Sequence, residues 1–188
     1  MKGRNVFKYM KPILLGFSFI LGFFPSFLRN WIWKLVDLLP NVIAVGFRWS
    51  LARASGAEIG ENVYIGHNVT VKNWKNLQIG SNVSIHENCF IDALARVRIG
   101  KNVSIAHASS ILAFDHNYSD DQVPIKYGEL IPEGIFIADD VWISAGVRIL
   151  RGSEINERCI IAANAVVRGR LDPRAIYGGV PARKLKDI

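Results

Sequence analysis

Residues 79–98 read IGSNVSIHENCFIDALARVR, and the same twenty-residue pattern stands before them as IGENVYIGHNVTVKNWKNLQ (59–78) and after them as IGKNVSIAHASSILAFDHNY (99–118). In each row an aliphatic residue recurs every six positions, in the first-quoted row as Ile79, Ile85 and Ile91. A small or β-branched residue follows most of these aliphatics four positions later, in the same row as Val83, Cys89 and Ala95. Because a helix repeats every 3.6 residues and a hairpin strand every two, a period of six fits neither.

The repeat predicts a mainly β fold, a parallel β-helix. Three short strands per turn, each with one large and one small inward residue, make a triangular coil of 18 residues, and the longer rows add two residues at one corner. Stacked coils bury the aliphatics in columns and pair their backbone groups with the coils above and below. After a break at residues 112–134 the six-residue period resumes at Ile137. We therefore assign residues 54–188 to a β-helix domain, with an extruded loop at 112–134 and a C-terminal tail at 173–188.

The composition is uneven along the chain of 188 residues, which is 50% hydrophobic and carries a net charge of +7. Residues 1–53 contain eight basic side chains against one acidic side chain, together with 11 of the 20 aromatic residues, whereas residues 54–188 balance 15 basic against 15 acidic side chains. The apolar fraction excludes a disordered chain, and two cysteines exclude a disulfide-stapled domain. Because the repeat domain is neutral, we expect no nucleic-acid partner.

Residues 1–53 form a hydrophobic and basic segment that we expect to be helical. Residues 12–28 contain no charge and are flanked by Lys8, Lys11 and Arg29. A spanning helix needs about 20 apolar residues, so this stretch is borderline. Its aromatic and basic residues suit a segment that lies in the headgroup region of an anionic membrane. The alternative is a helical cap that packs on the first coil and on the trimer. We expect a protein of the cytoplasm that attaches peripherally to the inner face of the cell membrane.

Residues 54–188 resemble the hexapeptide-repeat acyltransferases. The resemblance rests on the repeated I-G-x-N-V, on DDVWISAGVRI at 139–149, on IAANAVV at 161–167 and on YGGVPARKLK at 177–186. The chain is most similar to the branch that O-acetylates sugars, which includes the galactoside acetyltransferase type and enzymes of surface-polysaccharide biosynthesis. This resemblance implies a left-handed β-helix, a homotrimer with active sites between subunits, and acetyl-CoA as the donor substrate, with no metal ion.

His116 is the candidate catalytic residue. Acetyl transfer from a thioester to a hydroxyl needs a base for the hydroxyl proton, and histidine suits this role because its ordinary pKa is about 6.5. Of the four histidines, only His116 falls where the repeat breaks and the long loop begins, and long loops often carry function. The resemblance places the family's catalytic histidine at the same position, whereas the alternative is a structural corner histidine. Adjacent Asp115 could orient the imidazole, but neighbours on an extended chain point apart, which favours a solvated carboxylate.

The resemblance also indicates where coenzyme A binds. Backbone N–H groups of Ser144 and Ala145 match those that contact the thioester region in related enzymes, and Ala163 matches a backbone contact along the pantetheine arm. Trp142 matches a tryptophan that lines the same cleft, although a surface or trimer-packing aromatic is the alternative.

Three basic residues are candidates for the coenzyme phosphates. Arg183 and Lys186 align with basic family positions near these phosphates, whereas Arg168 replaces a residue that is usually uncharged. The alternative is that all three belong to a solvated charged face. Arginine binds phosphate through two parallel hydrogen bonds, and lysine binds it as a point charge.

The acceptor side departs from the family pattern. His86 stands where related enzymes commonly have an asparagine that holds the acceptor sugar, and it either binds a sugar hydroxyl or fills an exterior site. Asn88 and Asp92 are further substrate-binding candidates. Cys89 and Cys159 occupy small inward positions, so we expect reduced core thiols and direct transfer through a ternary complex, without an acyl-enzyme.

Together these features predict an acetyl-CoA-dependent O-acetyltransferase that acts on a sugar hydroxyl of a surface-glycan precursor, such as a capsule or O-antigen intermediate, which could be lipid-linked. One alternative is an N-acetyltransferase that acts on an amino-sugar nucleotide, and another is a non-catalytic, membrane-tethered trimeric scaffold. A metal site of the carbonic anhydrase type is disfavoured, because His67 and His107 sit two coils apart, roughly 9 to 10 Å at the strand spacing of a sheet.

Overall fold

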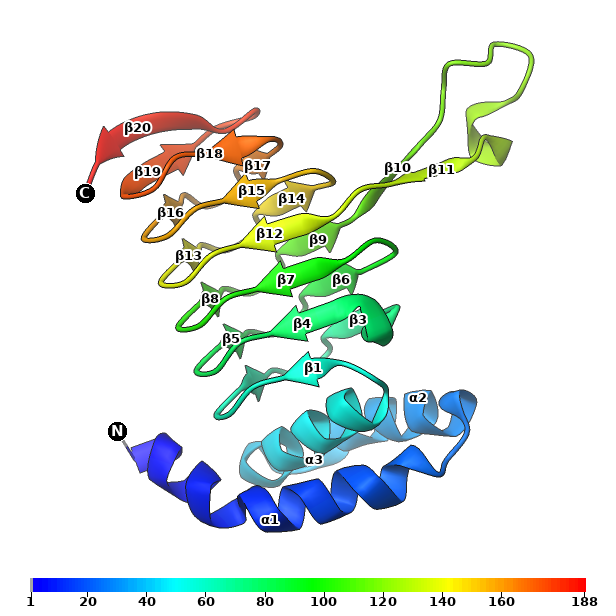
Figure 1. The fold of residues 1–188 in the computed structure, drawn as a ribbon, viewed down its shortest axis with the longest axis vertical. Coiled ribbons are helices and arrows are strands. Elements are labelled where there is room, and N and C mark those ends of the chain that lie inside the picture. Colours follow the sequence, from blue (N-terminus) through cyan, green and yellow to red (C-terminus); the bar gives the residue numbers. More distant parts are fainter. Residues whose placement is uncertain (1) are drawn as a thin grey trace.

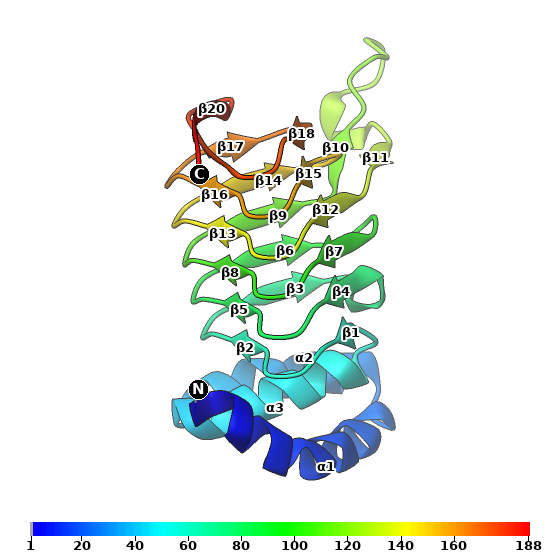
Figure 2. The same cartoon turned by 60° about the vertical axis from the view of Figure 1, so that its left-hand side comes forward.

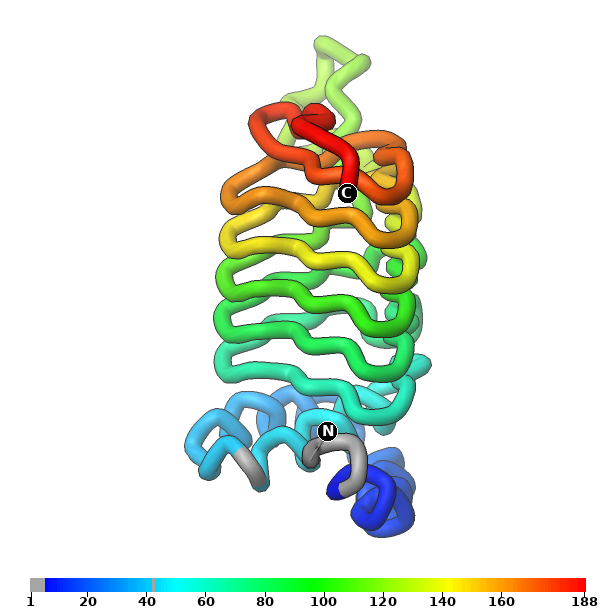
Figure 3. The backbone as a smooth tube through the Cα atoms, turned by 90° about the vertical axis from the view of Figure 1, so that its left-hand side faces the viewer, coloured from blue at the N-terminus to red at the C-terminus, as the bar shows by residue number. Residues whose placement is uncertain are grey.

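The chain builds a layer of helices followed by a long stack of β coils (Figure 1). The structure is a computed structural model that describes residues 2–188, with side chains described for residues 6–41 and 43–188. The N-terminal helices lie at one end of the stack, and the C-terminal strands close the other end (Figures 1 and 2). The tube view shows the coils stacked in parallel between these two ends (Figure 3).

Each regular coil contributes one strand to each of three parallel sheets, here called sheets A, B and C in chain order. Sheet A contains, in spatial order, β1 (Glu58–Ile59), β4 (Leu77–Ile79), β7 (Val97–Ile99), β12 (Ile135–Ile137), β15 (Glu154–Ile155) and β18 (Arg170–Leu171). Sheet B contains β2 (Tyr64–Ile65), β5 (Ser84–Ile85), β8 (Ser104–Ile105), β13 (Trp142–Ile143), β16 (Ile160–Ile161), β19 (Ala175–Gly178) and, antiparallel at its end, β20 (Arg183–Asp187). Sheet C contains β3 (Thr70–Lys72), β6 (Phe90–Asp92), β9 (Ser110–Leu112), β14 (Arg148–Leu150) and β17 (Val166–Val167). The mainly β, parallel β-helix fold is thereby confirmed.

The aliphatic columns of the repeat form the core. Ile59, Ile79 and Ile99 stack in sheet A, and each is at most 7% exposed. The corresponding columns of sheets B and C are buried in the same way, except that Val71 at the bottom of sheet C is only half-buried. Full burial of one such side chain contributes about 1.5–3 kcal/mol, so the stack is stabilised mainly by these columns.

The I-G-x-N-V motif is explained by the corner between sheets A and B. A Cβ on Gly80 would lie 2.6 Å from the backbone of Gly100 in the next coil, so only glycine fits. Asn82 adopts a left-handed conformation with φ of 60°, which asparagine tolerates better than most residues. Its side chain accepts a hydrogen bond from Asn62 (3.0 Å) and donates one to Asn102 (3.1 Å), which ties three coils together.

The break in the repeat is a two-stranded arm. Strand β10 (Phe114–His116) leaves the coil after sheet C and pairs antiparallel with β11 (Leu130–Pro132). A short 3-10 helix, η3 (Ile125–Tyr127), lies near the tip. The arm points away from the helical end of the molecule (Figure 1).

Three helices cap the first coil: α1 (Lys2–Gly22), α2 (Ser26–Leu35) and α3 (Asn41–Ala54), with a 3-10 turn η1 (Val36–Leu38) before α3. A second 3-10 turn, η2 (Trp74–Asn76), lies in the first coil. Helix α3 packs on β1 and β2, and α1 packs on α3 at the side away from the coils (Figures 1 and 2). None of the helices within residues 2–188 combines the length and apolar character that crossing a membrane requires.

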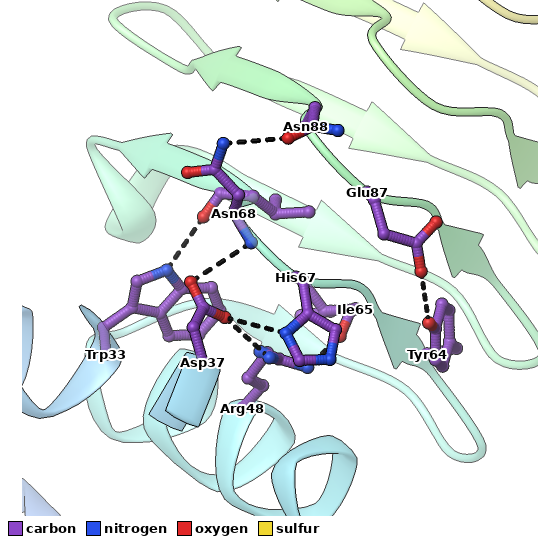
Figure 4. A network of polar contacts seen from close by, with 10 residues as sticks. Trp33, Asp37, Arg48, Tyr64, Ile65, His67, Asn68, Glu87 and Asn88 are labelled. Carbon is purple, nitrogen blue, oxygen red and sulfur yellow. Dashed lines mark hydrogen bonds and ion pairs between the residues drawn. The ribbon is translucent and has the colours of Figure 1, made fainter. Parts of the chain in front are cut away.

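A buried polar network joins the cap to the first coil (Figure 4). Arg48 is only 1% exposed, and its guanidinium donates to Asp37 at 2.6 Å and to the carbonyl of Ile65 at 3.1 Å. Asp37 also accepts from the backbone N–H of Asn68 at 3.1 Å. The indole of Trp33 donates to the carbonyl of Val69 at 2.8 Å. Each of these cap side chains satisfies a polar group at the open end of the solenoid, which would otherwise lack a partner coil.

Candidate functional site

His116 lies at the base of the arm, close to the corner between sheets C and A. It ends β10, where it pairs with Leu130 of β11, and its ring meets the Phe114 ring edge-on with a centroid distance of 6.3 Å. The side chain is exposed, and no hydrogen bond or ion pair within the described part of the chain engages its imidazole. Both ring nitrogens are therefore open to a ligand or to solvent, as a proton-transfer group requires.

Asp115 is held by two arginines instead of orienting His116 or facing only solvent. Its Oδ2 accepts from Arg151 Nε at 2.7 Å and from Arg168 Nη2 at 3.1 Å. Arg151 also donates to Glu133 at 2.5 Å, so one guanidinium binds a residue of β10 and the residue that follows β11. These carboxylates raise the pKa of Arg151, with the hydrogen bond to Asp115 as the largest cause. The structure therefore places Arg168 at the base of the arm, beside Asp115.

The ion pairs of Arg151 with Asp115 and Glu133, here called the Arg151 clamp, are expected to keep the arm closed. Replacing Arg151 with methionine keeps most of the aliphatic stem but removes both ion pairs, so we expect the arm to open more often. Limited trypsin digestion at Lys126, near the arm tip, should become several-fold faster. Arg158→Met is the matched control, because Arg158 pairs with Asp140 at 2.7 Å on a corner far from the arm. Equal digestion rates for the two variants would show that the clamp does not hold the arm.

A second group of candidates lies at the corner between sheets B and C. Ser144, Ala145 and Gly146 form this corner after β13, and Ala163 lies one coil further along, after β16. The N–H of Ser144 donates to the carbonyl of Ile161 at 3.0 Å, so it is not free to bind a ligand. In contrast, within the described residues no backbone carbonyl accepts from the N–H of Ala145 or of Ala163. These two N–H groups lie one coil apart, and the N–H groups of His67, Glu87 and His107 at the same position of the lower coils likewise have no described backbone acceptor.

The side chains at this corner become small only in the upper coils. The position of Ala145 and Ala163 is occupied in the lower coils by His67, Glu87 and His107, as the coil-to-coil hydrogen bonds show. An alanine side chain occupies less space beside the backbone than a histidine or glutamate side chain does. A thin, extended ligand can therefore lie against the backbone only beside the upper coils.

Arg148 was not among the predicted site residues, although it fixes this corner. Its Nη1 donates to the carbonyls of Ala108 at 2.6 Å and of Gly146 at 2.8 Å, one on each of two adjacent coils. Gly146 itself has φ of 71°, and a Cβ there would collide with Asn164 at 2.3 Å. In the sequence, Arg148 follows the small-residue run 144–146 after one valine. An arginine at such an outward position is equally typical of a solvated surface, so the sequence did not indicate its role.

Trp142 lies on the outer face of sheet B, between Ser104 of β8 and Ile160 of β16. It is 51% exposed and lines a shallow recess of about 230 Å³. Arg183 and Lys186 lie on β20, which extends the same sheet beyond β19. Trp142, Ser144, Ala145, Ala163, Arg183 and Lys186 are thus gathered on sheet B and its edge, in the coils nearest the C-terminus.

Two of the three acceptor candidates, His86 and Asn88, lie on the B–C corner between β5 and β6, whereas Asp92 lies at the far end of β6. His86 lies at the B–C corner, with its ring 5.6 Å from the Tyr64 ring and its Nδ1 3.7 Å from Glu87. Tyr64 donates to Glu87 at 2.7 Å, which lowers the pKa of that carboxyl group. Asn88 has a structural role, because its amide oxygen accepts from Asn68 at 2.8 Å in a ladder between coils.

Asp92 lies on β6, one coil below Leu112 of sheet C, and is 6% exposed. Its carboxylate accepts from Asn73 at 2.8 Å and lies 3.7 Å from the ammonium of Lys72. A carboxylate that is buried and already paired in this way is part of the corner's own structure.

The cysteines and histidines do not form a reactive centre of another kind. Cys89 and Cys159 are both buried, and burial raises the pKa of each thiol, so neither is a thiolate nucleophile. Within the described residues no three His, Cys, Asp or Glu side chains are grouped to hold a metal ion.

The two parts of the candidate site lie at different corners of the triangular coil. His116 follows sheet C, whereas Ala145 and Ala163 precede it, so the breadth of sheet C separates them within one chain. In chemical terms, the pair of corners offers an exposed base and two aligned N–H donors, which are the groups that acyl transfer needs.

Known proteins resemble part of this chain in sequence. The family model for bacterial transferase hexapeptide (six repeats) matches residues 134–169, which include β13 and the B–C corner. A Mycobacterium tuberculosis protein named as an acetyltransferase is 38% identical over 77 residues, covering 41% of this chain and 26% of that protein. WbbJ of Escherichia coli K12, named for O-acetyl transfer in lipopolysaccharide biosynthesis, is 30% identical over 88 residues, covering 42% of this chain and 45% of WbbJ. The chain thus spans less than half the length of either curated relative.

Solved structures match over most of the chain. A hexapeptide-repeat acetyltransferase from Vibrio cholerae, complexed with acetyl-CoA, superposes with a TM-score of 0.73 and 26% identity over 94% of this chain and 87% of its own. A galactoside acetyltransferase in complex with coenzyme A gives a TM-score of 0.75 and 28% identity over 85% of this chain and 79% of its own. Coverage of 94% of this chain means that the likeness to the first of these is not confined to the repeat.

Proposed function

We propose that the chain transfers the acetyl group of acetyl-CoA to a sugar hydroxyl. The match of residues 134–169 to the bacterial transferase hexapeptide model and the likeness to an acetyltransferase complexed with acetyl-CoA support this proposal. The observation that carries the proposal is the pair of N–H groups at Ala145 and Ala163 that donate to no described backbone carbonyl, on the sheet that also holds exposed Trp142 and two cations of β20. The pantetheine group of acetyl-CoA lies along the B–C corner beside Ala145 and Ala163. Arg183 and Lys186 bind the phosphates of the coenzyme. Arg168 approaches the donor only from a neighbouring copy, because it lies at the base of the arm.

His116 acts as the general base in this proposal. Its imidazole takes the proton of the sugar hydroxyl while the hydroxyl oxygen attacks the thioester carbonyl, and it then returns the proton to the leaving sulfur. The N–H of Ala145 donates to the oxyanion that forms between these steps. Because Ser144 N–H is already bonded, Ala145 supplies the backbone donor here. The protonated, buried thiols of Cys89 and Cys159 support direct transfer without an acyl-enzyme.

We propose a homotrimer in which the arm of one copy faces the B–C corner of the next. The separation of the two corners within one chain supports this arrangement. The acceptor is the sugar of a surface-glycan precursor, and similarity to WbbJ supports this class. His86, with Tyr64 and Glu87 beside it, offers polar groups to the sugar two coils below Ser144.

The decisive experiment identifies the acceptor. Purified protein is incubated with labelled acetyl-CoA and a panel of lipid-linked sugars, nucleotide sugars and amino-sugar nucleotides. We expect label on a sugar oxygen, located by mass spectrometry and lost on mild alkali. Label on an amino group would favour N-acetylation instead. Absence of both acetyl-CoA binding and transfer would favour a non-catalytic scaffold.

The small side chains of the B–C corner give a further prediction. Ala145→Leu places an isobutyl group where the pantetheine arm should lie, so we expect the KM for acetyl-CoA to rise at least tenfold while the fold is retained. The matched control is Glu157→Leu, which adds the same side chain at the exposed A–B corner of the next coil. Unchanged kinetics in Ala145→Leu would show that the donor does not use this corner.

Mixed oligomers test whether two copies share one site. The variants His116→Ala and Ala145→Leu each lack one half of the site, and they are co-expressed with different affinity tags. If the base and the donor corner come from different copies, doubly tagged oligomers contain some complete sites and recover part of the wild-type activity. If both halves belong to one chain, the mixed oligomers stay as inactive as either variant.

A further inference from the structure

The outer side of the helical cap exposes an unusual amount of apolar surface. Residues 6–43 hold 14 of the 24 large hydrophobic side chains that are exposed in the described part of the molecule. Among them, Phe19, Phe23 and Phe27 are 71%, 74% and 73% exposed, and Trp31 is 64% exposed. Soluble monomers rarely leave apolar patches larger than a few hundred square ångströms uncovered, so this face is a candidate interaction surface.

The helical cap also carries exposed cations. Lys8, Lys34 and Arg53 are exposed, and no carboxylate among the described side chains pairs with any of them. The single acidic residue of the segment, Asp37, is occupied by Arg48. Two such caps would repel each other, whereas an anionic surface would attract them. Charge therefore favours a lipid surface over a second copy of the chain.

A groove in the cap fits an acyl chain. It measures about 510 Å³ and is lined mainly by apolar residues, including Leu15, Phe19 and Gly22 of α1 and Phe23 just after it. Arg53, at the end of α3, is the one charged residue in its lining. An apolar slot with a single cation at its edge matches the chemistry of a phospholipid, whose acyl chains are apolar and whose phosphate is anionic.

We propose that the outer face of α1 and α2 docks on an anionic phospholipid surface, with Phe19, Phe23, Phe27 and Trp31 inserted among the headgroups and Arg53 paired with a lipid phosphate. The helices lie in the interface and do not cross it, which agrees with their lack of a spanning stretch. Because α1 is the layer farthest from the coils, the solenoid stands upright on the membrane (Figures 1 and 2).

This orientation sets the distance between lipid and active site, on the assumption that the proposed function holds. The B–C corner at β13 lies three coils beyond β2. With about 4.8 Å per coil and about 9–10 Å for each packed helix layer, the corner stands on the order of 30 Å above α1. The acceptor sugar must therefore be several units away from its lipid anchor, so the acceptor class is a lipid-linked oligosaccharide and not a lipid that carries a single sugar.

Vesicle sedimentation tests the docking face without any need for catalysis. The full-length protein is mixed with vesicles of phosphatidylserine and phosphatidylcholine, or of phosphatidylcholine alone, at low and high salt. We expect binding to the anionic vesicles at low salt and much weaker binding in 1 M salt, where screening is within about 3 Å. Phe23→Ser/Phe27→Ser should bind at least tenfold more weakly, because two exposed aromatic rings no longer enter the interface.

The arm supplies a matched control. Tyr118→Ser/Tyr127→Ser removes two aromatic rings that are 75% and 73% exposed, at the opposite end of the molecule, and should bind vesicles like the wild type. Two results would overturn the proposal. One is wild-type protein that stays in the supernatant at low salt. The other is a lipid-free oligomer that Phe23→Ser/Phe27→Ser dissociates, since the face would then be an interface between copies.

Acceptor length separates this inference from the proposed function. Transfer to a vesicle-bound oligosaccharide should fall in Phe23→Ser/Phe27→Ser, whereas transfer to the same glycan free in solution should not. If neither acceptor is acetylated but the vesicles are bound, the proposed function fails and the docking face stands. If single-sugar and oligosaccharide lipids are acetylated equally well on vesicles, the upright orientation is wrong.

Discussion

Replacing His116 with alanine is expected to lower kcat for acetyl transfer by about 100- to 10,000-fold, the usual contribution of a positioned general base. The imidazole is exposed at the base of the arm and makes no polar contact within the described chain, so its loss leaves no unsatisfied partner. The thermal unfolding midpoint should therefore stay within a degree or two of the wild type. Steady-state kinetics with acetyl-CoA and the identified acceptor, together with thermal unfolding, measure both quantities.

His67→Ala serves as the control for this variant. His67 is also a partly exposed histidine, but it lies on the first coil, beside the cap. It should retain wild-type turnover. A His116→Ala protein that turns over at a near-wild-type rate would remove His116 from the mechanism, and the base would then have to be sought elsewhere at the interface between copies.

Replacing Asp37 with alanine is expected to lower the free energy of unfolding by about 3 kcal/mol, the low end of the range for breaking a buried ion pair. The change removes the one carboxylate that pairs with Arg48 among the described side chains and leaves this 1% exposed guanidinium with one described backbone acceptor. It also frees the N–H of Asn68. Urea unfolding followed by fluorescence of the cap tryptophans, Trp33 and Trp49, measures the loss.

Glu61→Gln is the control for Asp37→Ala. Lys11 and Glu61 also join the cap to the first coil, at 2.5 Å, but their side chains are 41% and 56% exposed. Exposed ion pairs contribute at most about 1 kcal/mol, so this change should be nearly neutral. If both variants lose similar stability, burial of Arg48 is not what makes the Asp37 contact important. If Asp37→Asn is as stable as the wild type, hydrogen bonding and not charge holds the cap.

Most of the fold could be predicted from the repeat, because an inward aliphatic residue recurs every six residues along the coils. The prediction failed where the rows are longer. Ala95 was expected to point inward, yet it is half-buried, whereas Ala93 and Val97 are completely buried. The two extra residues of each long row bulge out at the corner between sheets C and A, so the inward phase shifts there.

The contacts of the candidate site were harder to foresee than its residues. The position of His116 followed from where the period breaks, but the Arg151 clamp joins residues that lie 36 and 18 positions apart, and no local pattern encodes such a contact. The donor corner was correctly located in the sequence, but only the coil-to-coil ladder reveals that Ser144 N–H is occupied. The cap could be expected to be helical from composition, whereas the burial of Arg48 depends on tertiary packing.

The asparagine ladder of the A–B corner has a consequence for how such chains can diverge. Because each lower coil bonds to the next through the same glycine and asparagine positions, a whole coil is an interchangeable spacer. Inserting or deleting one twenty-residue row below β8 would leave Ala145, Trp142 and the arm in the same mutual geometry. It would only lengthen or shorten the pedestal between the helices and the reaction centre, by about 4.8 Å for each row. The number of coils thus sets the distance between the helices and the reaction centre, and it can change without altering the candidate site.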